Sequence, residues 1–527
     1  MPQGRFQGRS LIAGVTATFS GDAAFFAFNP LDGKALEPAY HSVSLEDVDH
    51  AVRAAQDAAE FLASSSGADR ARLLRAIADG LDAAAEELIA RATSETALPS
   101  PRLTGEVART SRQLRLFASV AEQGAWLNAR IDTAEPNCVP PKPDIRSMLR
   151  PLGPVAVFGA SNFPLAFSVA GGDTASALAA GNPVIVKAHP AHPGTSELVG
   201  HIVNAAVAAA GFPSGSFSLL FDAGHSTGAA LVEHPGVKAV GFTGSFRGGR
   251  ALMDLAAKRR EPIPVYAEMG SSNPVFILPG ALAERADALA TGLFASFTLS
   301  GGQFCTKPGV VFAEEAKATA FTERLRERVA ASGSFHLLTE GIASVFRRQV
   351  EARGELILAC GAAKGEGFSA QVTLIEVPCA RFLADEHLAE EVFGPTTLLV
   401  QCDSREQMLA AAHGLEGHLT ATVLATDEDL ARNAELLRIL ETKVGRVIVN
   451  GFPTGVEVNQ AMVHGGPYPA TSDGRSTSVG SLAILRFARP VSYQGFPQFA
   501  LPPELQDANP RNIPQLWNGD LKLPAKA

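Results

Sequence analysis

Short apolar runs that alternate with helical segments are the feature that most restricts the fold of this chain. The runs lie at residues 154–158, 183–187, 217–221 and 237–242, with helical patterns at 171–180 and 196–210. Continuous runs of Val, Ile, Leu and Phe over four to six residues are typical of strands that are buried on both faces. Because helix-length segments separate these strands, the pattern predicts βα units and a parallel, doubly wound α/β sheet.

A second series of apolar runs predicts another α/β domain in the C-terminal half. It starts near Val265 and continues at 275–278, 310–312, 397–400, 421–424 and 446–450. Ahead of both series, Ser44 followed by Asp47 is a helix-capping signature, and Ala/Leu-rich sequence with helical spacing follows to about Arg115. We therefore expect a helical layer together with two open α/β sheets.

The composition excludes several classes of protein. A chain of 527 residues is too long for one core, so two or three domains are expected. The formal net charge of −9 argues against nucleic acid as a partner, because such binding relies on an excess of Lys and Arg. Five scattered cysteines without CxxC spacing indicate neither a disulfide framework nor a zinc site, and no metal is expected. Without a signal sequence or an apolar run near the roughly 20 residues of a membrane helix, we expect a cytoplasmic protein with no membrane partner.

Cys305 stands in a glycine-rich stretch, residues 300–309, near the middle of the chain. Small neighbours allow a substrate to approach the thiol, as a covalent catalyst requires. A buried structural cysteine is the alternative, because cysteine is among the most buried residue types. Polar residues elsewhere in the sequence favour the interpretation of Cys305 as a nucleophile.

Ligands of open α/β sheets bind at the carboxyl ends of the strands, where three polar residues are found. Asn162 follows the first run, and its amide could donate a hydrogen bond to a substrate oxygen. Lys187 ends the next run, where a cation could meet a ribose or a phosphate. Glu268 follows the run near Val265, where burial would raise the pKa of its carboxyl toward that of a general base. A turn cap, a solvated lysine and a surface glutamate are the respective alternatives.

Two further stretches carry weaker signals. Residues 241–250 could form a glycine-rich turn from strand to helix that offers backbone N–H groups to a pyrophosphate, although they do not match GxGxxG. Glu390 and Glu391 precede a Gly-Pro turn, which by itself would usually be a solvated helix end.

In order, these motifs resemble the NAD(P)-dependent aldehyde dehydrogenase superfamily from about residue 40 to residue 495. The matching motifs are Asn-Phe-Pro at 162–164, the strand-end Lys187, Phe-Thr-Gly-Ser at 242–245, Glu-x-Gly at 268–270, Gly-Gln-x-Cys at 302–305 and Glu-x-Phe-Gly-Pro at 391–395. Segments 105–115 and 302–309 are similar to the bacterial 2-oxoglutarate-semialdehyde (2,5-dioxopentanoate) dehydrogenases. A fatty-aldehyde dehydrogenase of luminous bacteria is a related type.

The resemblance implies covalent catalysis at Cys305. Its thiolate would attack the aldehyde, Asn162 would hold the oxyanion, and Glu268 would activate the water that hydrolyses the thioester. Lys187 belongs to both the catalytic and the cofactor set. The other residues expected at the cofactor are His189, His225, Thr243, Gly244, Ser245, Gly248, Glu391 and Phe393, and those expected at the substrate are Phe163, Arg112, Phe304 and Phe452.

The resemblance also implies a Rossmann-type cofactor domain, an α/β catalytic domain and a small oligomerisation hairpin. The expected bounds are 1–133 and 151–267 for the cofactor domain, 268–480 for the catalytic domain, 134–150 and 481–500 for the oligomerisation elements, and 501–527 for an extended C-terminal tail. The proline-rich arm before Arg146 and the strand-like residues 484–487 match the family's hairpin and its partner strand. A homodimer or a dimer of dimers is therefore expected.

Pro190 departs from the family in a position that bears on the cofactor. Many NAD-specific members have an acid there that binds both adenosine ribose hydroxyls. Without that carboxylate a 2′-phosphate is not repelled, and Lys187 with His189 or His225 could face it. We therefore expect NADP to be preferred, with NAD as a possible cofactor.

The substrate expected is a short semialdehyde that ends in a carboxylate, with 2-oxoglutarate semialdehyde as the first candidate. Arg109 and Arg112 are spaced to share a helix face, and one of them could pair with the carboxylate. Phe163, Phe304 and Phe452 would instead suit a medium- or long-chain fatty aldehyde.

Two other classes remain as alternatives. A CoA-acylating relative would not need Glu268, and a non-catalytic structural descendant would be expected to have lost Cys305 or Glu268. This chain has both residues.

Overall fold

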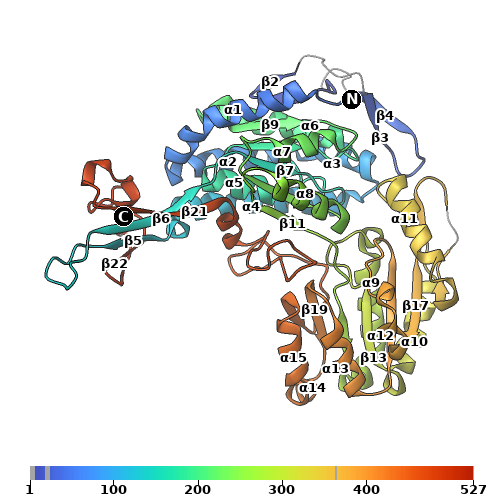
Figure 1. The fold of residues 1–527 in the computed structure, drawn as a ribbon. Coiled ribbons are helices and arrows are strands. Elements are labelled where there is room, and N and C mark those ends of the chain that lie inside the picture. The colour runs from blue at the N-terminus through green and yellow to red at the C-terminus, as the bar shows by residue number, and fades with distance from the viewer. Residues whose placement is uncertain (1–5, 18–23, 363–364, 526–527) are drawn as a thin grey trace.

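The computed structural model describes residues 6–17, 24–362 and 365–525, and its upper body in Figure 1 is built on a seven-stranded sheet. In spatial order the strands are β11 Val265–Glu268, β10 Ala239–Thr243, β7 Val155–Phe158, β8 Val184–Lys187, β9 Phe217–Leu220, β1 Leu11–Ile12 and β2 Val15–Thr16. The first five are parallel, and β1 and β2 add an antiparallel edge. The parallel sheet predicted from the apolar runs is confirmed.

Helices cover both faces of this sheet, which explains why its strands are apolar throughout. Val155 and Val157 pack into the core under α2, α4, α5 and α6, whereas Ala156 and Phe158 pack into the core under α1, α7 and α8. The bounds are α1 Leu45–Ser64, α2 Gly67–Ala83, α3 Ala85–Thr96, α4 Ser100–Gln123, α5 Gly172–Ala180, α6 Pro193–Ala209, α7 Ser226–Glu233 and α8 Phe246–Lys258. The predicted cap at Ser44 is present as a capping box with Asp47.

Strand β11 corrects one sequence-based prediction. The apolar runs alone group Val265 with the second series, whereas the bounds implied by the family resemblance place residues 265–267 with the first; β11 pairs in parallel with β10, with Val240 opposite Val265. An apolar run indicates that a strand is buried, but it does not indicate which sheet the strand joins. Glu268, the last residue of β11, therefore stands at the edge of the first sheet and faces the second body.

The lower body in Figure 1 holds a second seven-stranded sheet. Its strands are β15 Ile357–Cys360, β17 Thr373–Pro378, β18 Thr396–Cys402, β13 Val310–Glu314, β12 Val275–Ile277, β19 His418–Leu424 and β20 Val444–Val449. All neighbours are parallel except β15 and β17. Its helices are α9 Pro279–Thr298, α10 Glu315–Ala330, α11 Glu340–Glu351, α12 Cys379–Ala384, α13 Arg405–Gly414, α14 Asp427–Arg432 and α15 Ala434–Glu441. The second α/β unit is confirmed, although the runs at β15 and β17 were missed.

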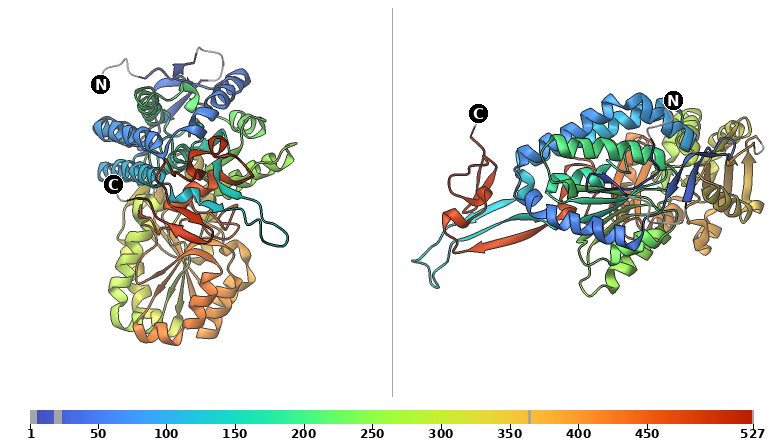
Figure 2. Two further views of the ribbon diagram at one scale, coloured as in Figure 1. Left: turned by 90° about the vertical axis from the view of Figure 1, so that its left-hand side faces the viewer. Right: turned by 90° about the horizontal axis from the view of Figure 1, so that it is seen from above.

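A third sheet forms an arm that projects from the upper body (Figures 1 and 2). Its strands, in order, are β21 Ala488–Gln494, β6 Ile145–Pro151, β5 Ala129–Asp132, β22 Gln515–Trp517 and β23 Asp520–Lys522. Residues 484–487, predicted as a strand, lie instead in the 3-10 helix Ser481–Phe487, because Ile484 and Phe487 turn inward to the core of the upper body. The paired strand begins one residue later.

The C-terminal tail is folded back rather than extended. Strand β22 pairs in parallel with β5, and β23 pairs with β22. Arg146 fixes the start of the tail, since its Nη1 donates to the carbonyl of Leu505 and to Asp507, both at 2.6 Å. Because β22 joins β5, residues 129–132 belong to the arm, although the expected cofactor domain included them. Residues 1–5, 18–23, 363–364 and 526–527 of the expected ranges lie outside the described residues.

Two small two-stranded sheets complete the described structure. In one, a turn at residues 29–33 joins β3 Ala24–Phe28 to β4 Ala35–His41, and in the other β14 Ser334–His336 pairs with β16 Ser369–Gln371. None of the helices in the described ranges combines the length and apolarity needed to cross a bilayer.

Candidate active site between the two sheets

Cys305 lies in a tight turn whose backbone is held by a buried asparagine. Ser300, Gly301 and Gly302 have φ of 50°, 66° and 69°, a left-handed run that glycine adopts without strain. The Asn273 amide donates to the carbonyls of Cys305, at 2.8 Å, and Lys307, at 3.0 Å. Asn273 thus fixes the backbone on both sides of Thr306, and the thiol is presented from a rigid loop.

Glu268 is buried at the end of β11, and its side chain points toward this loop. The carbonyl of Glu268 accepts a hydrogen bond from the N–H of Gly244 at 3.0 Å, and its backbone bridges to Thr471. Its Oε2 is buried without a hydrogen-bond partner. Burial raises the pKa of the Glu268 carboxyl to about 8. This agrees with the rise in pKa expected from the sequence for a general base.

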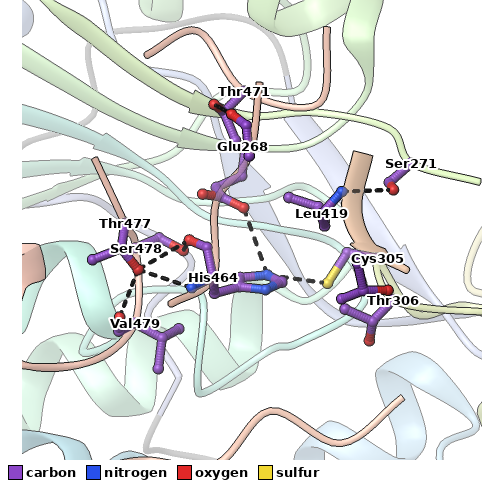
Figure 3. Close-up of polar contacts among 12 residues, drawn as sticks. Glu268, Ser271, Cys305, Thr306, Leu419, His464, Thr471, Thr477, Ser478 and Val479 are labelled. Carbon is purple, nitrogen blue, oxygen red and sulfur yellow. Dashed lines mark hydrogen bonds and ion pairs between the residues drawn. The ribbon is translucent and has the colours of Figure 1, made fainter. Parts of the chain in front are cut away.

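His464 lies between Glu268 and Cys305 (Figure 3), a placement that the sequence did not predict. Its Nε2 is 3.5 Å from the Cys305 sulfur and 3.6 Å from Glu268 Oε2. The backbone N–H of His464 donates to Thr477 Oγ1 at 2.9 Å. Burial, together with nearby arginines, lowers the pKa of His464 to about 3, so the ring is neutral. A neutral ring nitrogen can accept the thiol proton or, in the other tautomer, donate to an anion.

The Cys305 thiol is not a thiolate at rest. Burial, followed by the negative charges of Glu268 and Glu391, raises its pKa to about 12, and Arg109 opposes the rise. Because the thiolate is the nucleophile, the thiol needs a base before it can attack. His464 is the base in reach of the thiol, and Glu268 lies on the far side of its ring.

Asn162 stands beside the nucleophile on a loop that helix α4 holds in place. Its Nδ2 donates to the Gln303 carbonyl at 3.0 Å. Glu106 accepts the backbone N–H groups of Leu165, at 2.9 Å, and Ala166, at 3.0 Å. Arg102 pairs with Glu106 and donates to the Asn162 carbonyl at 2.8 Å. The amide that was predicted to hold an oxyanion therefore lies close to Cys305.

A cavity of about 250 Å³ opens in front of the thiol. Phe163 and Phe304, both predicted at the substrate, line it with ring centroids 5.1 Å apart, and Phe167 adds a third ring. The Arg109 guanidinium also lines the cavity and lies 4.9 Å from the Phe167 centroid. Its Nη2 is buried without a hydrogen-bond partner. The wall thus combines aromatic rings with an arginine donor that is still free.

Two predicted substrate residues are not in this cavity. Arg112 is exposed, because α4 turns that position away from the loop that carries Asn162. Phe452 packs against the core beneath α9, where its ring lies close to Gly292. The spacing of Arg102, Glu106 and Arg109 would have identified the inner face of the helix, since residues at i, i+4 and i+7 share a face.

The predicted cofactor residues of the first sheet gather at its carboxyl edge. Lys187 is buried and donates to the Asp222 carbonyl at 3.0 Å, and burial lowers its pKa. Strand β10 ends at Thr243, and Ser245 Oγ caps α8 by accepting the N–H of Gly248 at 3.2 Å. Gly244 and Ser245 are exposed, so the N–H groups at the start of α8 face an open surface.

The two predicted histidines differ in their surroundings. His189 stacks on His192 with centroids 5.6 Å apart, and burial lowers its pKa well below the usual value. It lines, with Pro190, a separate cavity of about 530 Å³ between the β3–β4 hairpin and the end of β8. His225 is exposed at the start of α7.

Glu391 and Phe393 lie on a loop of the second body that contacts the nucleophile turn. Burial raises the pKa of Glu391, and the charge of Lys307 opposes the rise. All five cysteines are free. In the described part of the chain, no group of three or more His, Cys, Asp or Glu side chains could hold a metal ion.

Comparisons with known proteins agree with this geometry. The sequence matches the aldehyde dehydrogenase family over residues 19–477. It is 50% identical over 521 residues to alpha-ketoglutaric semialdehyde dehydrogenase 2 of Azospirillum brasilense, covering 97% of this chain and 98% of that protein. It is 44% identical over 489 residues to alpha-ketoglutaric semialdehyde dehydrogenase of Acinetobacter baylyi, covering 92% and 93%.

Solved structures show the same fold. Lactaldehyde dehydrogenase superposes with a TM-score of 0.81 at 22% identity, covering 92% of this chain and 98% of that chain. The 1-pyrroline-5-carboxylate dehydrogenase from Thermus with bound NAD gives a TM-score of 0.80 at 21% identity, covering 92% of each chain. Since the family match spans most of the sequence and two relatives are at least 44% identical over nearly its whole length, the chain belongs to the aldehyde dehydrogenase family.

Proposed function

We propose that this chain oxidises 2-oxoglutarate semialdehyde to 2-oxoglutarate, with NAD(P) as the hydride acceptor. The observation that carries the proposal is the row of Cys305, His464 and Glu268 beside a cavity that also presents Arg109. A thiol, a neutral ring and a carboxyl in that order can form a thioester and then hydrolyse it. The names of the Azospirillum and Acinetobacter relatives support the choice of substrate.

Acylation begins when the Cys305 sulfur attacks the aldehyde carbon and forms a thiohemiacetal. The thiol proton must leave, because the raised pKa keeps the sulfur protonated near neutral pH. His464 Nε2 is in reach of that proton and can accept it, and the proton then leaves to solvent, so that Glu268 is still free to act as the base of deacylation. The Asn162 amide and the backbone N–H of Cys305 are the donors for the developing oxyanion.

The cofactor residues fit a dinucleotide at the edge of the first sheet. When bound, NAD(P) supplies the nicotinamide ring that accepts the hydride. The exposed N-terminus of α8 at Ser245 would hold the pyrophosphate. Lys187 and Glu391 would bind ribose hydroxyls, and Phe393 would contact the nicotinamide side. The Lys187 ammonium supports this fit to a dinucleotide. One of its three N–H groups donates to the Asp222 carbonyl, so the others can donate to a ribose hydroxyl.

Deacylation requires a base in the dry pocket, and Glu268 is the base proposed. Its Oε2 has no hydrogen-bond partner and can accept a proton from a water that attacks the thioester. Hydrolysis releases the acid and returns Cys305 to the thiol. A CoA-acylating enzyme would have no use for this carboxyl.

Arg109 is the side chain that we propose for the distal carboxylate of the substrate. Its Nη2 is buried in the cavity wall without a partner, and a carboxylate would supply the missing acceptor. Arg102 is already engaged by Glu106 and the Asn162 carbonyl. Arg112, the original candidate, is exposed outside the cavity.

A preference for NADP over NAD is part of the proposal. Pro190 brings no carboxylate to the adenosine ribose, and the cavity of about 530 Å³ beside it leaves space for a larger group. The described residues that line this cavity include no lysine or arginine. Glu340 lines this cavity and opposes a 2′-phosphate there. Lys187, at the end of β8 and outside this lining, is therefore the positive charge proposed for that group, since burial keeps His189 neutral.

Assembly as a homodimer or a dimer of dimers, in the cytoplasm, completes the proposal. The arm extends away from both bodies, and Val139 near its tip is 99% exposed. An exposed sheet edge such as β21 presents unpaired N–H and C=O groups to which a strand of another chain can bind. The arm is thus the surface proposed for the partner subunit.

A medium- or long-chain fatty aldehyde is the second candidate substrate. The rings of Phe163, Phe167 and Phe304 would suit an apolar chain. Against it stand the buried Arg109 and the names of the two relatives. The non-catalytic alternative has no support, because Cys305 and Glu268 lie together.

The first prediction concerns the two chemical steps. Cys305→Ala abolishes aldehyde oxidation, whereas Glu268→Gln leaves a rapid burst of reduced cofactor followed by slow turnover. In the unmodified enzyme the deacylation rate rises with pH through about 8, because only the ionised carboxylate is a base. Stopped-flow absorbance between pH 6 and pH 10 measures both phases. Steady oxidation by Cys305→Ala would exclude a covalent route.

The second prediction concerns His464. His464→Gln removes the ring that accepts the thiol proton, so the burst slows by roughly 100-fold and its pH dependence moves to higher pH. His413→Gln, at an exposed histidine on α13, is the matched control and changes neither. The burst rate with saturating cofactor is the measurement. A burst of normal rate in His464→Gln would leave Glu268 as the only base.

The third prediction distinguishes Arg109 from Arg112. Arg109→Met lowers kcat/KM for 2-oxoglutarate semialdehyde by roughly 10- to 100-fold, the value of a charge-assisted hydrogen bond, and leaves hexanal unaffected. Arg112→Met serves as the matched control and has little effect on either aldehyde. If the unmodified enzyme prefers hexanal or a longer aldehyde, the fatty-aldehyde candidate replaces the semialdehyde.

The fourth prediction concerns the cofactor. The unmodified enzyme shows a higher kcat/KM with NADP than with NAD, and Pro190→Glu shifts the preference toward NAD by about 1–3 kcal/mol through repulsion of the 2′-phosphate. Steady-state kinetics with both cofactors give the ratio. A preference for NAD in the unmodified enzyme contradicts this interpretation of the loop.

A further inference from the structure

Lys307, two residues after Cys305, is a buried lysine with only 1% of its surface exposed. Its ammonium donates to the Val392 carbonyl at 2.9 Å and to the Thr396 carbonyl at 2.8 Å. These two carbonyls lie on either side of Phe393. A cation on the nucleophile turn is thus bonded to the loop that carries two proposed cofactor residues.

The nucleophile turn and the loop that carries Glu391 and Phe393 touch at a second point. A Cβ placed on Gly302 would lie 2.1 Å from the carbonyl oxygen of Gly394, so the backbones are in direct contact there. The loop is also held from its other side, because Gln349 Nε2 donates to the Glu391 carbonyl at 3.1 Å. Lys307 is therefore the charged contact in a set that fixes the loop against the turn.

The charges around Lys307 explain how a lysine is tolerated there. Burial lowers its pKa, and the carboxylate of Glu391 opposes that change. Glu391, Glu390 and the Arg353 guanidinium line the same small cavity of about 20 Å³, which has room for one water. An apolar side chain would avoid the cost of burying an ion. Unlike an apolar side chain, Lys307 provides directional hydrogen bonds to the carbonyls of Val392 and Thr396.

We infer that Lys307 is a positioning residue, which fixes the loop of Glu391 and Phe393 at a set distance from the Cys305 sulfur. The inference rests on the proposed function, because it is the dinucleotide ribose and nicotinamide that this loop would hold. It assigns to Lys307 an effect on cofactor binding and on hydride transfer, and none on the intrinsic reactivity of the thiol.

The test compares Lys307→Met, which keeps the length of the side chain and removes its donors, with Lys317→Met at an exposed lysine of α10. Lys307→Met raises the Kd of NADP, measured by calorimetry without aldehyde, by about tenfold, as expected for losing one net charged hydrogen bond. The KM of the cofactor rises with the Kd, and the KM of the aldehyde stays within about twofold. Hydrolysis of 4-nitrophenyl acetate, which needs Cys305 and no cofactor, stays within about threefold.

Lys307→Gln keeps one amide donor and gives an intermediate Kd, and this variant serves as the test if Lys307→Met does not fold. An unchanged Kd in both variants overturns the inference. So does a parallel loss of ester hydrolysis and cofactor binding with a lower Tm, since that pattern marks a purely structural lysine. The proposed function is judged separately on the unmodified enzyme, which must reduce a dinucleotide with an aldehyde; if it does not, both fail.

Discussion

The placement of one partly buried sulfur atom beside two buried titratable side chains is the constraint on which the rest of this structure depends. Burial raises the pKa of Cys305 to about 12 and of Glu268 to about 8, and it lowers the pKa of His464 to about 3. Near neutral pH all three groups are therefore mainly uncharged. These three groups therefore avoid the cost of buried ions at rest, and they become charged only as a proton moves during the reaction.

Buried backbone polar groups need hydrogen-bond partners, and side chains supply them for the carbonyls of Gln303, Cys305 and Lys307 around the thiol. Asn273 donates from its amide to two carbonyls of the nucleophile turn and accepts the hydroxyls of Ser271 and Thr420 on its oxygen. Its φ of 46° lies in the left-handed region that asparagine tolerates better than most residues. This side chain takes the place of water as the hydrogen-bond partner of the turn, and it fixes the position of a thiol that is only partly buried.

The sequence predicted those parts of the structure that have a local signature. Strands β7 and β8 are buried at every residue, so their apolar runs were sufficient. Local signatures also identified two site residues: the glycines around Cys305 and the apolar strand that ends at Glu268. The partner of β11 was missed because pairing is a tertiary choice that the run itself does not encode.

His464 had no such signature. It lies in an irregular segment 159 residues from Cys305, where no periodic pattern places a side chain, and only the closed fold brings it to the sulfur. The prediction that Arg112 binds substrate was wrong for a related reason. A spacing of three residues places Arg109 and Arg112 on one helix face, but it does not show which face of the helix lines the cavity. The folded tail was also unpredictable, since its strand β22 depends on the distant edge of β5.

Helix α4 connects the two ends of the proposed substrate. Its inner face holds the Asn162 loop through Glu106, and one turn later it presents Arg109 to the cavity. Both contacts belong to one continuous 24-residue helix that packs on α2. In the proposed function, the distance between the oxyanion donor and the carboxylate donor is therefore set by helix geometry rather than by a mobile loop. A substrate whose length matches that distance places its aldehyde carbon at Cys305, whereas a longer or shorter aldehyde acid does not. A rigid helix can therefore select substrate length without a closing lid.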